Sequence, residues 1–387
     1  GSSCRARAPP EARGQAVTAT RALQRGYLVI ADISGYTSYL TRSVLEHAHG
    51  IVDELTQLVI ARLGAPLRFV ELEGDAVFAY APVAAFADAE RLLDMIEGCY
   101  VAFRLRLEEM RRATTCTCSA CALIGALDLK FVAHLGSFVL QQSPTGPKPI
   151  GPDVILVHRL LKNGVAEALG TKAYALLTDT LLARAGGTLG LPAHREHYDD
   201  LGEVRGRVAD LTQAVARHRE ARIFVARGEG DLELVTPLPV PRAVAWEYHI
   251  DPRKRMRWQL DAREIEAKPN AAGRAGVGWE SHCDHGAYTL VHRAVDWRPF
   301  DYLTLETTPI TRGPLALPRS LSTFEFIEDG PDRSVVAMNV RALDRGLLSR
   351  ITIPLAALVI RRQFRAHYAV LSRVLEEGRQ AWAVGAG

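Results

Sequence analysis

The sequence predicts an α+β protein of two domains, and three observations lead to that prediction. Strand and helix signals alternate from Gly26 to residue 228. After the turn-forming residues 227–230, strand-like stretches follow one another until a single long helix near the end of the chain. A length of 387 residues corresponds to about two domains of ordinary size. We expect the domains at 26–228 and 229–382, after a disordered basic leader at 1–25.

The composition is typical of a globular protein, with 48% hydrophobic and 24% charged residues. The net charge of +3 is smaller than the +4 that five arginines and one glutamate give to the first 26 residues alone. The rest of the chain is therefore near neutral, which excludes an extended nucleic acid-binding surface. No apolar run approaches the ~20 residues of a membrane span, and six cysteines in so long a chain indicate a reducing, cytoplasmic location.

The periodicity of apolar residues predicts the elements of each domain. In the first domain we expect strands at 27–31, 129–134 and 173–177, a hairpin at 67–80, and helices at 39–63, 84–110 and 153–169, with one face of the sheet exposed. In the second domain we expect short helices within 242–258, strands near 262–266, 278–283, 288–296, 302–308, 320–327 and 334–340, and a helix at 355–377. The second order is that of a helix-grip fold, in which a curved antiparallel sheet and a long helix enclose an apolar cavity.

Two aspartates follow apolar strands in the first domain. Asp32 lies in the segment 30–37, and Asp75 lies in the hairpin turn of the segment 71–78. Two carboxylates on neighbouring strands, beside a small-residue turn that opens a helix, form a site for hard cations and for the phosphates those cations carry. The alternative is that Asp32 caps a helix and Asp75 occupies an ordinary hairpin turn.

These two segments resemble the class III nucleotide cyclase homology domain, which has a ferredoxin-like fold. The segments 131–136, 151–159 and 204–206 are similar to further parts of that family. The resemblance implies a homodimer that binds a purine nucleotide with two Mg²⁺ or Mn²⁺ ions. It assigns the metal to Asp32, Ile33 and Asp75, the nucleotide phosphates to Gly35, Tyr36 and Thr37, and catalytic charge stabilisation to Arg159 and Arg205.

The resemblance also places Glu71 and Lys148 where the family reads the purine edge. A carboxylate accepts the N1 and N2 hydrogens of guanine and an ammonium group donates to O6, so the pair favours guanine over adenine. Each residue could instead be an ordinary solvated charge. The position of the family's ribose-binding asparagine holds Ile155, whose side chain cannot form a hydrogen bond.

Three cysteines are close together at Cys116, Cys118 and Cys121. The chain resembles here a narrower, uncharacterised bacterial cyclase-like family with a Cys-rich insertion before the strand at 127–131. Three thiolates could bind zinc with Cys99 or a histidine as the fourth ligand. Reduced, partly buried thiols and an iron–sulfur cluster are the alternatives.

The second domain resembles the START-like SRPBCC superfamily of hydrophobic-ligand binders and polyketide cyclase-like proteins. The matching segments are 239–246, 276–278, 282–286 and 296–300, with Asp251, Pro252 and Trp258. A lipid-like or aromatic ligand is expected in its cavity, lined by the aromatic residues Trp246, Trp258, Trp279, Phe324 and Phe364. Aromatic packing in a closed core is the alternative.

Two functions remain open. The first is a nucleotide cyclase, a phosphorus–oxygen lyase that converts GTP to a cyclic nucleotide and is coupled to a ligand-binding domain. The second is a catalytically inactive sensor in which the SRPBCC domain binds the ligand. Ile155 favours the sensor, and the paired aspartates and both arginines favour the enzyme.

Overall fold

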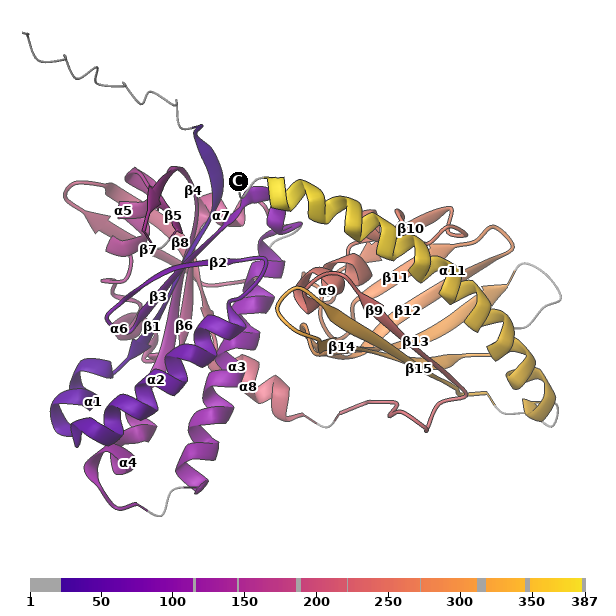
Figure 1. Cartoon of the computed structure of the whole chain (residues 1–387), viewed down its shortest axis with the longest axis horizontal. Helices are drawn as coiled ribbons and strands as arrows, with labels where there is room; N and C mark the ends of the chain where they lie inside the picture. The colour runs from indigo at the N-terminus through magenta and orange to yellow at the C-terminus, as the bar shows by residue number, and fades with distance from the viewer. Residues whose placement is uncertain are drawn as a thin grey trace, which may run out of the picture.

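The structure is a computed structural model that describes residues 22–113, 116–144, 146–185, 189–220, 222–271, 273–311, 318–344 and 349–384. Most of the predicted basic leader at 1–25 lies outside these residues. The two halves of the chain form two sheets that lie beside each other (Figure 1).

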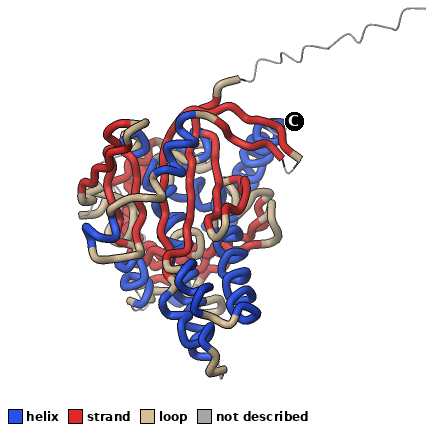
Figure 2. The backbone as a smooth tube through the Cα atoms, turned by 90° about the vertical axis from the view of Figure 1, so that its left-hand side faces the viewer, coloured by secondary structure: helices blue, strands red, loops and turns tan. Residues whose placement is uncertain are grey.

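The first sheet has eight strands, and its central path runs in the order β2-β3-β1-β4-β6-β8-β7, with β5 paired to β4. Figure 2 views the protein from the side of this first half, with strands in red. Only the β4–β6 pairing is parallel; the others are antiparallel. The strands are β1 (Gln24–Ser34), β2 (Arg68–Glu73), β3 (Ala76–Pro82), β4 (Asp128–Ser143), β5 (Gly146–Ile150), β6 (Tyr174–Thr178), β7 (Ala193–Tyr198) and β8 (Gly202–Asp210).

The helices of the first half pack on both faces of this sheet. They are α1 (Tyr36–Arg42), α2 (Leu45–Arg62), α3 (Ala89–Ala113), α4 (Ser119–Leu123), α5 (Pro152–Arg159), α6 (Val165–Leu169), α7 (Asp179–Leu182) and α8 (Thr212–Arg219), with 3-10 turns at Val83–Ala85 and Ile124–Ala126. Residues of β1 alternate between two cores: Tyr27 and Val29 face the core that contains α2 and α3, whereas Leu28 and Ile30 face the core that contains α5. The expectation of one exposed sheet face is therefore wrong at the centre of the sheet.

The second sheet has seven antiparallel strands in the order β10-β11-β12-β13-β14-β15-β9. The strands are β9 (Leu232–Leu238), β10 (Glu264–Lys268), β11 (Glu280–Asp284), β12 (Tyr288–Arg298), β13 (Tyr302–Thr311), β14 (Ser320–Glu328) and β15 (Ser334–Ala342). The short helices α9 (Arg242–Ile250) and α10 (Pro252–Arg255) follow β9, and the long helix α11 (Ser349–Val384) lies across the sheet (Figure 1). The predicted α+β class, with an antiparallel second sheet and a long C-terminal helix, is confirmed. The domain limits stay predictions.

Two predicted helices are each broken in the structure. The helix expected at 39–63 is interrupted at Ser43 and Val44, which have extended backbone angles between α1 and α2. The helix expected at 153–169 ends at Arg159, and a second helix begins at Val165. Between them, the Asn163 side chain forms two local hydrogen bonds: it donates to the carbonyl of Leu160 and accepts from the Val165 N–H. Local side-chain hydrogen bonds of this kind compete with the helical ladder.

The two halves meet at α3, whose N-terminal part carries the buried charged residues Glu90, Arg91 and Asp94. Asp94 is 1% exposed and receives hydrogen bonds from Arg91 at 2.8 Å and from Arg274, of the second half, also at 2.8 Å. Arg274 also donates to Glu97 at 2.9 Å, and Glu90 accepts from the backbone N–H of Ala275. The same hydrophobic core continues through both halves, so this ionic cluster lies in the interior of the protein.

Among the described residues, no helix is both long and apolar enough to span a membrane.

We predict that Arg274→Ala lowers the free energy of unfolding by about 3 kcal/mol, because it leaves buried carboxylates on α3 without one of their counter-charges. Urea unfolding of the full chain measures this loss. The control is Arg333→Ala, since the Arg333–Asp329 pair is exposed on both sides and should contribute less than about 1 kcal/mol. Equal losses in the two variants would contradict the structural role of the cluster.

Candidate functional site

Asp32 lies near the end of β1, the strand between β3 and β4. The register places it opposite Ala76 on β3 and opposite Lys130 on β4. The Lys130 ammonium lies 3.1 Å from the Asp32 carboxylate, and each side chain is about one-fifth exposed. Asp32 therefore pairs with Lys130 rather than capping a helix, since the N-cap of the following helix is Gly35 and receives no side-chain hydrogen bond. Sequence analysis missed Lys130, whose pairing with Asp32 depends on the register of β4.

Asp75 follows Gly74 in the turn between β2 and β3, where Gly74 has a φ of 69°. Its carboxylate accepts hydrogen bonds from its own N–H and from the N–H of Ile33, the residue after Asp32. Burial, and secondly the negative charge of Asp32, raise the pKa of Asp75 to about 6. The structure thus brings Asp32 and Asp75 close enough to repel each other. A divalent cation would relieve that repulsion.

The small-residue turn beside these carboxylates is held by close packing. Gly35 has a φ of 89°, and a Cβ on it would lie 2.8 Å from the carbonyl oxygen of Ala126. Tyr36 and Thr37 begin α1 directly after it. Ile33, predicted as a metal ligand, is 2% exposed, so only its backbone carbonyl could serve that purpose.

The two predicted base-reading residues are in contact. The Lys148 ammonium, on β5, lies 2.5 Å from the Glu71 carboxylate, on β2. Both are partly exposed, with side-chain exposures of 41% and 31%. Close to this pair, His158 Nδ1 lies 3.0 Å from the Glu73 carboxylate, and sequence analysis did not single out either residue.

Both predicted catalytic arginines are exposed, and neither joins the carboxylate pair. Arg159 ends α5, on which Ile155 is 58% exposed. Arg205 forms an ion pair with Glu203 on its own strand, β8. In the sheet order β4 and β6 separate β8 from β1, a distance of roughly 14 Å at about 4.8 Å per strand.

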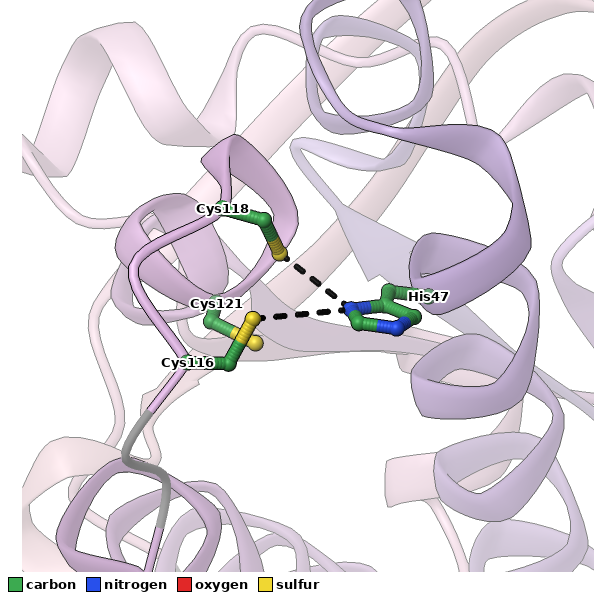
Figure 3. A group of neighbouring side chains, drawn as sticks. All are labelled: His47, Cys116, Cys118 and Cys121. Carbon is green, nitrogen blue, oxygen red and sulfur yellow. Dashed lines mark hydrogen bonds between the residues drawn. The ribbon is translucent and has the colours of Figure 1, made fainter.

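The three clustered cysteines meet a histidine from α2 (Figure 3). Cys116, Cys118 and Cys121 lie with His47 so that one ligand atom from each falls within 4.8 Å of all the others. Hydrogen bonds from the backbone N–H of Cys121 and from His47 lower the pKa of the Cys118 thiol to about 6. Cys99, the other fourth ligand considered, is buried in α3 at 1% exposure, and burial raises its pKa to about 12.

The aromatic residues of the second half form a packed core. Trp246, Trp258 and Trp279 are at most 4% exposed, and Phe324 and Phe364 pack against the same core. Trp246 meets the rings of Trp297 and Phe326 with centroids 5.1 Å apart. Such edge-to-face contacts are those of a filled interior.

A groove of about 650 Å³ opens instead between β9 and α11. Apolar lining comes from Leu234, Val235 and Pro237, and cationic lining from Arg361 and Arg365. None of the five predicted pocket residues lines it. Tyr368 connects the groove to the core, since it lines the groove and its hydroxyl hydrogen-bonds with the buried His249 at 3.0 Å.

A further hydrogen-bonded cluster, around Asp261, was not anticipated from the sequence. Asp261 contacts His285 at 3.2 Å and His367 at 2.9 Å, and Gln363 donates to it as well. Hydrogen bonds from these histidines lower the pKa of Asp261. The cluster fastens α11 to the region before β10.

A family model described as a protein of unknown function, DUF2652, matches residues 52–168. An uncharacterized protein of Mycobacterium tuberculosis is 31% identical over 148 residues, which are 38% of this chain and 66% of that protein. The match thus spans just under two thirds of that relative's length.

Similar solved structures include cyclases and START-superfamily proteins. The guanylyl cyclase Cya2 is 17% identical with a TM-score of 0.36, over 49% of this chain and 93% of that one. A bacterial light-regulated adenylyl cyclase is 14% identical with a TM-score of 0.36, over 52% and 59%. A START superfamily protein from Mycobacterium smegmatis is 10% identical with a TM-score of 0.30, over 38% and 97%.

We predict that Asp75→Asn stabilises the metal-free protein at pH 7 but not at pH 4. Because the folded pKa of Asp75 is raised from 3.8 to about 6, the stability it contributes is present below about pH 4 and is lost as the pH rises through about 6. The variant has no such loss, so its advantage at pH 7 should be about 2 kcal/mol after allowance for partial exposure.

Urea unfolding in EDTA at a series of pH values measures this difference. The control is Asp53→Asn, an exposed carboxylate on α2 whose removal should leave the pH profile unchanged. Parallel profiles for the wild type and Asp75→Asn would show that the pKa of Asp75 is not raised in the folded protein.

Proposed function

We propose that the first half of the chain binds a purine nucleotide through divalent cations held by Asp32 and Asp75. The observation that carries this proposal is the placement of the two carboxylates: the Asp75 carboxylate accepts the N–H of Ile33, the residue after Asp32, and burial, followed by the charge of Asp32, raises its pKa. Mg²⁺ and Mn²⁺ prefer oxygen ligands, keep part of their hydration shell and are commonly bound by one or two carboxylates together with substrate phosphates. Where bound, such ions would polarise the phosphoryl oxygens.

Other residues of the chain would contact the phosphates and the base of the nucleotide. Lys130 lies next to Asp32 and offers an ammonium group to the same region, and the turn at Gly35 allows the backbone to approach a ligand closely. Glu71 and Lys148 together present an acceptor and a donor, the pattern that complements guanine. We therefore propose GTP as the preferred nucleotide.

Turnover to a cyclic nucleotide would require Arg159 or Arg205 near the phosphates. The distance of β8 from β1 means that one chain does not bring Arg205 to its own Asp32. We propose that a second copy supplies Arg205, so that a homodimer forms the complete site. Ile155 leaves the ribose without a hydrogen bond from that position, which favours slow turnover or nucleotide binding alone.

The test is calorimetry of the full chain with GTP and ATP in Mn²⁺, with products resolved by mass spectrometry. Binding that is lost in Asp75→Asn and retained in Asp53→Asn supports the proposal. A cyclic product shows a cyclase, and binding without product shows a nucleotide sensor. Absence of metal-dependent binding by the wild type overturns the proposal.

We predict that Glu71→Lys reduces the preference for GTP over ATP by about 5-fold to 150-fold, since a base-reading pair is worth about 1–3 kcal/mol of discrimination. The matched control is the double variant Glu71→Lys/Lys148→Glu, which restores an ion pair but reverses its polarity. It should fold as the wild type does and still lose the preference. Equal affinities for GTP and ATP in the wild type would refute base reading by this pair.

A second candidate function is ligand sensing by the groove between β9 and α11. Arg361 favours it, because its Nε is buried without a hydrogen-bond partner among the described residues. A ligand with an apolar body and an acidic group would match Leu234 and Val235 on one side and the arginines on the other.

We predict that Arg361→Ala weakens binding of a long-chain fatty acid by about 10-fold, through loss of a charge-assisted hydrogen bond. Tryptophan fluorescence measures it, because Trp258 packs on Tyr368 at the groove. Arg362→Ala is the control, since Arg362 is exposed and does not line the groove. A wild type that binds no fatty acid would leave the groove without this role.

A further inference from the structure

We propose that His47, Cys116, Cys118 and Cys121 form a closed, tetrahedral zinc site with a structural role. The sequence places three of these residues together, but His47 lies 69 residues before Cys116, on α2. The proposal does not depend on nucleotide binding, because the site shares no residue with the carboxylate pair.

The distances between the ligand atoms fit a tetrahedral zinc ion. Bonds of about 2.3 Å to sulfur and 2.0–2.1 Å to nitrogen place the ligand atoms of a tetrahedron roughly 3.5–3.8 Å apart. His47 Nδ1 lies 3.3 Å from Cys118 Sγ and 3.7 Å from Cys116 Sγ (Figure 3). All four ligand atoms lie within 4.8 Å of one another, so small side-chain rotations complete the geometry.

The backbone around the cysteines supports metal binding. Cys118 and Cys121 have the two-residue spacing common in zinc sites, and the sulfur of Cys118 accepts the N–H of Cys121. The segment is also fixed in place: the Val44 N–H donates to the Ser119 hydroxyl and the buried Tyr39 hydroxyl donates to the Ala120 carbonyl.

A structural role follows from the ligand set. Three cysteines and one histidine fill all four positions, so no position remains for water or substrate, as catalytic zinc requires. The ion would tie the start of α2 to the connection between α3 and β4. That connection continues to Ala126, whose carbonyl oxygen packs against Gly35. Zinc would thus hold in place the connection between α3 and β4, which packs against the turn at the start of α1.

The first experiment measures metal content of the full chain purified without chelator. We expect about one zinc ion per chain by elemental analysis. Replacement by Co²⁺ should give the intense visible bands of tetrahedral cobalt together with a sulfur-to-cobalt charge-transfer band. Iron in place of zinc, no metal at all, or a cobalt spectrum without the sulfur band would each overturn the proposal.

The second experiment assigns the histidine. His47→Ala should weaken zinc affinity by at least about 100-fold, measured by competition with a chromogenic chelator. His49→Ala is the matched control, since His49 is an exposed histidine on the same helix and should leave the affinity unchanged. Equal affinities of the two variants would overturn the role of His47. Because His47 is exposed, this substitution tests the site without disturbing the core.

Discussion

The burial of charged side chains on α3 is the constraint on which the arrangement of the two halves depends. Asp94 is almost completely inaccessible to water, and an unpaired carboxylate there would be very unfavourable. Its partners are Arg91 on the same helix and Arg274, which lies 180 residues further along the chain. Because Arg274 must reach Asp94 and Glu97 together, the second half can pack on α3 in few ways. The continuous hydrophobic core then forms around that contact.

The candidate nucleotide site depends on the apolar packing of β1, a strand that is buried on both faces. β1 is packed between α2 and α3 on one side and α5 on the other, so its backbone position is fixed by side chains on both faces. Asp32 lies where that rigid strand approaches its end, opposite Lys130 and near the turn that carries Asp75. A rigid scaffold can therefore hold two repelling carboxylates close together. Carboxylates whose pKa is raised by burial and by a neighbouring negative charge are common at functional sites.

Much of the fold could be predicted from the sequence. The hairpin turning at residues 73–75, the run of antiparallel strands and the long last helix all follow from local periodicity and turn chemistry. The breaks at Ser43 and at Asn163 could not be predicted, since they depend on hydrogen bonds and packing that periodicity does not encode. Leu358 and Val359 belong to the apolar pattern that predicts the helix at 355–377, yet their side chains are 67% and 64% exposed. The apolar pattern predicts a helix, but it does not show which face of the helix is buried.

For the candidate sites, the sequence by itself determined the types of ligand: a carboxylate pair, a cysteine cluster and a charged pair at Glu71 and Lys148. Only the tertiary structure decided which residues meet. Lys130 reaches Asp32 through strand register, His47 reaches the cysteines through the packing of α2, and the tryptophans fill a core while the groove forms along β9 and α11. The physical reason is that ligand chemistry is a property of single residues. Proximity across tens of residues is instead set by how whole elements pack.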